Sequence, residues 1–110
     1  MKDKFALGSL ELKLLLAVFD CNNEAYGLQI QQKIKQETGR EIAVGAIYTT
    51  MARLQDRKLV TSSEGDHQSD RLGRPRRYFT VTGAGVRAIR EAEAELRSLG
   101  LKPNFGLTGS

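Results

Sequence analysis

The fold of this chain is decided by the stretch Val44–Val81, VGAIYTTMARLQDRKLVTSSEGDHQSDRLGRPRRYFTV. Its first part has the periodicity of a helix, because apolar residues recur at i, i+4 and i+7 in Ile47, Met51 and Leu54. An apolar pair, a polar segment with a basic end and a short alternating stretch follow in that order. This succession predicts a winged helix, in which one helix enters a DNA groove and a cationic hairpin lies on the neighbouring phosphates.

The residue types set the boundaries expected within this stretch. We expect a helix over Val44–Lys58, a strand over Leu59–Ser63, a polar loop over Glu64–Gly73 and a return strand over Arg76–Val81. At about 100° per residue, the helix face opposite its apolar stripe carries Gly45, Thr49, Ala52, Arg53 and Asp56. The return strand alternates, so Arg77 and Phe79 share one side and Arg76 and Tyr78 the other.

Three further helices are expected outside this stretch. Ser9 is placed to cap a helix up to residue 20 or 21, which is apolar around most of its circumference and is therefore expected to be buried on more than one side. A second helix begins near Tyr26 and ends at Gly39, a residue suited to a C-terminal cap. Thr82 is placed to cap a last helix with nearly coiled-coil spacing of apolar residues.

The predicted fold class is α+β, mainly α: a winged helix-turn-helix with a two-stranded wing and a C-terminal dimerisation helix. The DNA-binding domain is expected at residues 1–82, the dimerisation helix at 83–100 and a disordered tail at 101–110. With 110 residues the chain has room for one domain, and its net charge of +4 is compatible with a nucleic-acid partner.

The remaining composition bears on compartment and chemistry. One cysteine, Cys21, permits no internal disulfide, and no apolar run reaches the ~18–20 residues of a membrane span, so a cytoplasmic protein is expected. The one histidine, His67, lies in the polar loop, and no spacing of His, Cys and carboxylates suits a metal. The segment Thr82–Gly85 is too short for a phosphate-binding glycine loop and fits a helix cap better. We expect neither an enzyme nor a cofactor.

Five segments match, in the same order, the sequence pattern of a known protein family. They are GSLELKLLLA at 8–17, AYGLQI at 25–30, VGAIYTTMARL at 44–54, RKLV at 57–60 and GRPRRYFTVTG at 73–83. Together they resemble the PadR family of bacterial transcriptional regulators, over about residues 8–99, in its short form with one helix after the wing. Three positions depart from that pattern. The family often has proline at Val44 and Thr49 and usually glycine at Lys58, so the operator sequence is not carried over.

The resemblance implies that the third helix lies in the major groove. Arg53 would pair with guanine, Thr49 would contact a thymine methyl or a base edge, and Tyr48 would bond a phosphate. The expected DNA-binding residues are Gly45, Ala46, Tyr48, Thr49, Arg53, Arg74, Arg76 and Arg77. Two plainer interpretations stay open: a core helix with a solvated back, and a wing whose arginines (71, 74, 76 and 77) only solubilise the loop.

We expect a homodimer whose interface is formed by the first and last helices of each subunit. The interface would comprise Leu12, Leu16, Phe19, Val86, Ile89, Leu96 and Leu99, although the seam of the last helix can also pack on its own domain. A two-fold dimer would bind a near-palindromic operator in double-stranded DNA. The predicted function is a repressor released by a small-molecule effector, which the family resemblance implies. The candidates to line its site are Phe5, Leu12, Leu16, Phe19, Val86, Ile89 and Leu96, and ordinary core packing stays open for each. The alternative is a winged-helix protein–protein adaptor without specific DNA binding.

Overall fold

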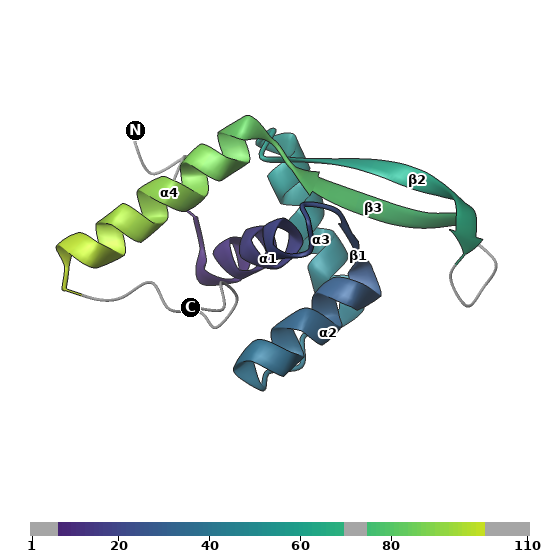
Figure 1. Cartoon of the computed structure of the whole chain (residues 1–110), viewed down its shortest axis with the longest axis horizontal. Helices are drawn as coiled ribbons and strands as arrows, with labels where there is room; N and C mark the ends of the chain where they lie inside the picture. Colours follow the sequence, from purple (N-terminus) through teal and green to yellow (C-terminus); the bar gives the residue numbers. More distant parts are fainter. Residues whose placement is uncertain (1–6, 70–74, 101–110) are drawn as a thin grey trace.

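The computed structural model of the chain describes residues 7–69 and 75–100. Its elements are α1 (Ser9–Asp20), β1 (Ala25–Tyr26), α2 (Gly27–Thr38), α3 (Val44–Asp56), β2 (Val60–Ser69), β3 (Pro75–Val81) and α4 (Gly83–Ser98). In Figure 1, α1, α2 and α3 form the body, the hairpin of β2 and β3 projects to one side, and α4 runs toward the other. This arrangement is a mainly helical winged helix-turn-helix, as the sequence predicted.

The sheet has three antiparallel strands in the order β1-β3-β2. The two strands of the predicted wing are β2 and β3, and β1 is an additional strand that the sequence analysis missed. It pairs Ala25 with Phe79 and Tyr26 with Tyr78. Two residues are too short to show a period of two, which explains the omission. The side chain of Asn23 extends this edge, because it accepts from Val81 N at 2.9 Å and donates to Val81 O at 3.2 Å.

The other boundaries shift by a few residues. The hairpin strand β2 runs to Ser69, beyond the expected Ser63, because backbone pairing with β3 does not require apolar side chains. The recognition helix α3 ends at Asp56, because Lys58 adopts a left-handed conformation with φ of 64°. The cap of α1 is Gly8 rather than Ser9, and the Gly8 N–H donates to Glu11 Oε1 at 2.8 Å.

A single core joins the helices to the sheet. Residues 14–18 of α1 are all buried, which confirms that this helix is enclosed on more than one side. Ile47, Met51 and Leu54 point from α3 into the same core, as predicted, and Phe79 enters it from β3. Thr82 caps α4 as expected, since its Oγ accepts from Gly85 N at 3.0 Å.

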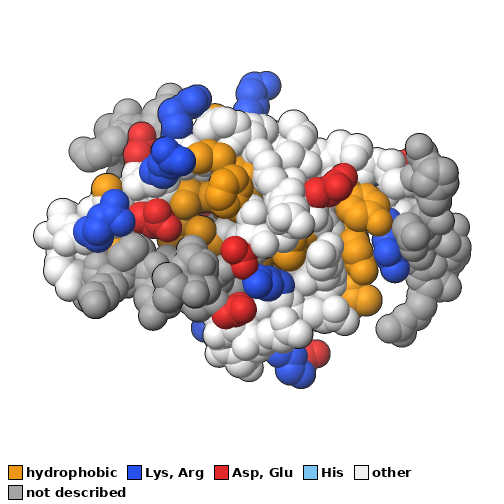
Figure 2. All heavy atoms as spheres, in the orientation of Figure 1, with side chains coloured by type: hydrophobic (Ala, Val, Ile, Leu, Met, Phe, Trp, Pro, Cys, Tyr) orange, Lys and Arg blue, Asp and Glu red, His pale blue; other side chains and the backbone are white. Residues whose placement is uncertain are grey.

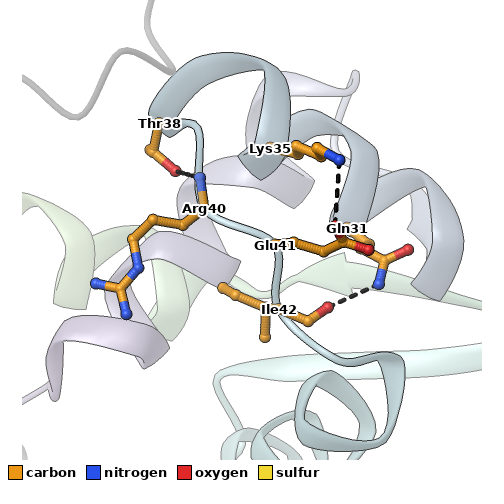
Figure 3. A network of polar contacts seen from close by, with 6 residues as sticks. All are labelled: Gln31, Lys35, Thr38, Arg40, Glu41 and Ile42. Atoms are coloured by element: carbon orange, nitrogen blue, oxygen red, sulfur yellow. Dashed lines mark hydrogen bonds and ion pairs between the residues drawn. The ribbon is translucent and has the colours of Figure 1, made fainter.

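Polar contacts join α2 to the turn that connects it with α3 (Figure 3). Gly39 ends α2 with φ of 78°, a conformation that glycine adopts without a steric penalty. Gln31 donates to Ile42 O at 2.8 Å, and the ammonium of Lys35 lies 3.1 Å from Glu41 Oε1. Both contacts tie α2 to the segment that leads into α3.

Candidate nucleic-acid interface

The outer face of α3 is exposed along its length. Gly45, Ala46, Tyr48, Thr49 and Arg53 all lie on the surface, while the apolar stripe of the same helix is buried. The Thr49 hydroxyl donates to Gly45 O at 3.0 Å within the helix, which orients its methyl group and remaining lone pairs. No atom outside the local chain lies within 4 Å of a Cβ built on Gly45, so the start of the helix is open to close approach.

Tyr48 lies at the flank of this face, between the sheet and α2. Its ring centroid is 5.9 Å from that of Phe79, and the side chain is 41% exposed. On its other side the ring meets Gly27, where an added Cβ would lie 2.8 Å from the Tyr48 hydroxyl oxygen. The hydroxyl is therefore placed beside the first residue of α2, at the positive end of that helix dipole.

The two described wing arginines lie on opposite faces of β3, in agreement with the predicted alternation. Arg77 is exposed on the face that carries Phe79; it donates to Ser62 Oγ at 3.1 Å and lies 3.5 Å from Glu64 Oε2. Arg76, on the other face, stacks on an aromatic ring, with its Cζ 4.1 Å from the centroid of Tyr26. The other expected wing contact, Arg74, and its neighbour Arg71 lie outside the described residues.

Tyr26 is a residue of this region that sequence reasoning did not single out. Its ring meets Tyr78 edge-on, with 5.5 Å between centroids and 74° between planes. Tyr26 and Tyr78 are register partners in β1 and β3. Only the pairing of these strands brings the two tyrosines together, so no local sequence pattern predicts the contact.

The residues expected at a dimer interface fall into two groups in the single chain. Leu12, Leu16 and Ile89 are buried in its own core and leave little surface for a partner. Phe19 and Leu99 are 47% and 72% exposed, and Val86 and Leu96 are half-buried. Figure 2 shows hydrophobic side chains gathered on the surface over α4 and α1, flanked by charged groups.

Metal-ligand groups and membrane-spanning helices are not found in the described parts of the chain. Within residues 7–69 and 75–100, no three His, Cys, Asp or Glu side chains are grouped to hold a metal ion. No helix in these ranges is long and apolar enough to cross a membrane. Cys21 is half-buried, and burial raises the pKa of its thiol, an effect that Lys33 partly offsets.

An exposed recognition-helix face beside a wing that carries arginines defines the chain as a DNA-binding protein of the winged helix-turn-helix class. The model of the transcriptional regulator PadR-like family matches residues 15–91, more than half of the sequence, and the chain belongs to this family. It is therefore a DNA-binding transcriptional regulator and not an enzyme. No match was found among curated proteins.

Solved structures support the same fold. A PadR family transcription regulator from Clostridium difficile R20291 superposes with a TM-score of 0.65 at 20% identity, covering 81% of this chain and 90% of that one. A PadR family regulator from Eggerthella lenta gives 0.63 at 27% identity, with 83% and 79% covered. A putative transcriptional regulator from Thermoplasma acidophilum gives 0.65 at 18% identity, with 83% and 86% covered.

Proposed function

We propose that this protein is a homodimeric repressor that occupies a near-palindromic operator and is released by a small-molecule signal. The observation that carries the DNA-binding part is the open outer face of α3, which lies next to the wing. In this proposal Arg53 pairs with a guanine, Thr49 contacts a thymine methyl or base edge, and Gly45 and Ala46 let the backbone approach. Tyr48 and the wing arginines Arg74, Arg76 and Arg77 bind phosphates.

The dimer is proposed from the apolar surface that the single chain leaves open. The last helix has Val86 and Leu96 half-buried and Leu99 exposed, and Phe19 adds an exposed ring at the end of α1. A second copy that packs α4 and α1 against their counterparts covers this surface. The two recognition helices of such a dimer bind successive turns of the duplex, which accounts for a near-palindromic site.

Release by an effector is the third part of the proposal. A small molecule that binds at the α1–α4 interface shifts the spacing of the two recognition helices and lowers operator affinity. Phe19, Val86 and Leu96 are the accessible candidates to line such a site, whereas Leu12, Leu16 and Ile89 are packed in the core. Phe5 lies outside the described residues. We propose that the regulator acts on DNA in the cytoplasm.

Fluorescence anisotropy with two duplexes tests the function. One duplex carries the region upstream of the regulator's own gene, and the other is a shuffled version of it. We expect preference for the native duplex and a steep loss of affinity with salt, because Lys and Arg contacts release counterions. Equal weak binding to both duplexes contradicts a specific regulator of its own gene.

Arg53→Ala tests the base contact in the same assay. One bidentate contact to guanine contributes about 1–3 kcal/mol of discrimination between bases. The variant is therefore expected to lose affinity for the preferred duplex and to keep most of its binding to the shuffled one. An equal loss on both duplexes assigns Arg53 to phosphate rather than to a base.

A further inference from the structure

We propose that Tyr26 is a positioning residue for DNA binding: its ring holds the Arg76 guanidinium in place to meet a backbone phosphate where the wing contacts the duplex. This inference rests on the proposed function and adds to it a residue that lies outside both α3 and the wing tip. It starts from a difference between two arginines that are neighbours in the sequence.

Arg76 and Arg77 have different partners. Arg77 lies 3.5 Å from Glu64 and donates to Ser62, so part of its charge is balanced within the wing. Arg76 is stacked at 4.1 Å on Tyr26 and has no ion pair with any carboxylate whose side chain the structure describes. Stacking uses the face of the guanidinium and leaves its N–H edge available to an acceptor. With respect to the described side chains, the charge and the N–H donors of Arg76 therefore stay open to an external anion.

The ring under Arg76 is itself held from two directions. Tyr26 is paired with Tyr78 across the β1–β3 register, and the Tyr78 ring meets it edge-on at 5.5 Å. Tyr78 in turn lies over Gly65, where a Cβ would come within 2.6 Å of its ring. The tyrosines thus form a supported platform, and an arginine held on it loses less side-chain freedom when it binds an anion.

The platform joins the wing to β1, the strand that leads directly into α2. Tyr26 is followed directly by Gly27, the first residue of α2, and Gly27 touches the ring of Tyr48 on α3. Arg76 reaches the Tyr26 ring from β3, two residues closer to the hairpin end than Tyr78, the register partner of Tyr26. In Figure 2, hydrophobic side chains and a basic side chain lie together below the wing, in the corner that it makes with the start of α2. Phosphate contacts of this kind fix the register of a recognition helix in the groove.

A phosphate contact is independent of sequence, so the experiment uses the full chain and a random-sequence duplex over a range of NaCl concentrations. We expect Tyr26→Leu to bind about two- to fivefold more weakly, and Tyr26→Phe to retain wild-type affinity because it keeps the ring. Arg76→Ala is expected to lower the slope of log K against log [NaCl] by about 1 for each phosphate that the arginine neutralises. Arg90→Ala, at an exposed position on α4 outside the proposed DNA-binding residues, is the matched control and is expected to leave the slope unchanged.

The double variant Tyr26→Leu/Arg76→Ala separates positioning from a general structural role. If Tyr26 acts through Arg76, the double variant binds no more weakly than Arg76→Ala alone. The proposal is overturned if Tyr26→Leu lowers DNA affinity by the same factor with and without Arg76. It is also overturned if Tyr26→Phe lowers the affinity as much as Tyr26→Leu does. Thermal unfolding of each variant shows that the fold is retained.

Two further results need their own interpretation: a Tyr26→Leu variant that does not fold, and a wild-type protein that does not bind DNA. If Tyr26→Leu does not fold, Arg76→Lys takes its place, because lysine keeps the charge but lacks the planar group that stacks. We expect it to bind about two- to fivefold more weakly, and unchanged affinity contradicts the inference. A wild-type protein that binds no duplex at low salt refutes the proposed DNA-binding role itself and not the positioning alone.

Discussion

The ring of Tyr48 occupies the space that a side chain on Gly27 would fill. A Cβ at Gly27 would lie 2.8 Å from the Tyr48 hydroxyl oxygen and 2.9 Å from Cζ, both closer than Cβ contacts in proteins allow. Gly27 is the buried first residue of α2, and Tyr48 projects from the N-terminal half of α3. Since Phe79 packs on the ring from the sheet side, the absence of a side chain at Gly27 selects the position of Tyr48.

Gly27→Ala is therefore expected to displace Tyr48 and to weaken DNA binding. The ring is partly exposed and has room to move, so unfolding free energy should fall by only about 1 kcal/mol, at the low end for an overpacked site. Anisotropy and thermal unfolding measure the two effects. Gly83→Ala is the matched control, because Gly83 also begins a helix and the nearest atom to its Cβ is a flexible Arg87 nitrogen at 3.8 Å. If Gly27→Ala binds DNA with unchanged affinity, Tyr48 does not contact a phosphate.

Gly45→Ala is expected to separate stability from DNA binding. The Cβ of an alanine there meets nothing within 4 Å, and alanine is the better helix former by about 0.5–1 kcal/mol. The variant should therefore unfold at a higher temperature. If the backbone at the start of α3 approaches a base edge, the added methyl group lowers operator affinity despite the stabler fold. A variant that is stabler and binds equally well argues that α3 docks without close contact at Gly45.

The helices were predictable from sequence, whereas the contacts between the wing and α2 were not. The burial of Ile47, Met51 and Leu54 can be predicted from the sequence, because their helical spacing is apparent within one or two turns. The strand β1 has no such period. It depends on Val81, 58 residues from Asn23 in the chain, for the side-chain bonds that extend it. Strand register depends on tertiary contacts. The stacking of Arg76 on Tyr26 therefore could not be predicted from the sequence either.

Lys58 departs from the family pattern at a position with a strained backbone conformation. The family usually has glycine at this position, and here the lysine has φ of 64°, which costs a residue with a Cβ about 1 kcal/mol. The backbone is held there by Lys58 N donating to Gln55 O and by Thr82 Oγ donating to Lys58 O. The strain is thus imposed by the junction of α3, β2 and the α4 cap.

Lys58→Gly is accordingly expected to raise the free energy of unfolding by about 0.5–1 kcal/mol, the reverse of the usual effect of glycine. Urea denaturation followed by circular dichroism measures the change. Gln36→Gly, at an exposed position within α2, serves as the comparison and should lose about 1 kcal/mol. A destabilised Lys58→Gly variant would show that the lysine side chain contributes more than its backbone strain costs.

Cys21 is expected to react slowly with alkylating reagents in the folded protein. Burial raises the pKa of its thiol above the ordinary value of 9.0, and only the thiolate is the nucleophile. The folded state therefore holds this proton more tightly than the unfolded chain. Its contribution to stability is complete below about pH 9 and is lost as the pH rises through the folded pKa. Iodoacetamide labelling at pH 8, with and without urea, measures the difference by mass spectrometry, and equal rates contradict it.

The proposed dimer is tested by a charge placed on α4. Leu96 is half-buried in the single chain and Ala94 is exposed on the same helix. Leu96→Glu puts a carboxylate on the proposed seam, where it is desolvated without a partner, and we expect the dimer to weaken about tenfold or more. Ala94→Glu adds the same charge outside the seam and should leave the dimer intact.

Light scattering gives the oligomeric state of both variants, and anisotropy gives their operator affinity. Since each subunit of a two-fold dimer binds one half-site, the two quantities should fall together in Leu96→Glu. A monomeric variant that binds the operator as tightly as wild type separates DNA recognition from dimerisation. An unchanged dimer places the interface elsewhere on the molecule, and the exposed Phe19 at the end of α1 then becomes the next position to alter.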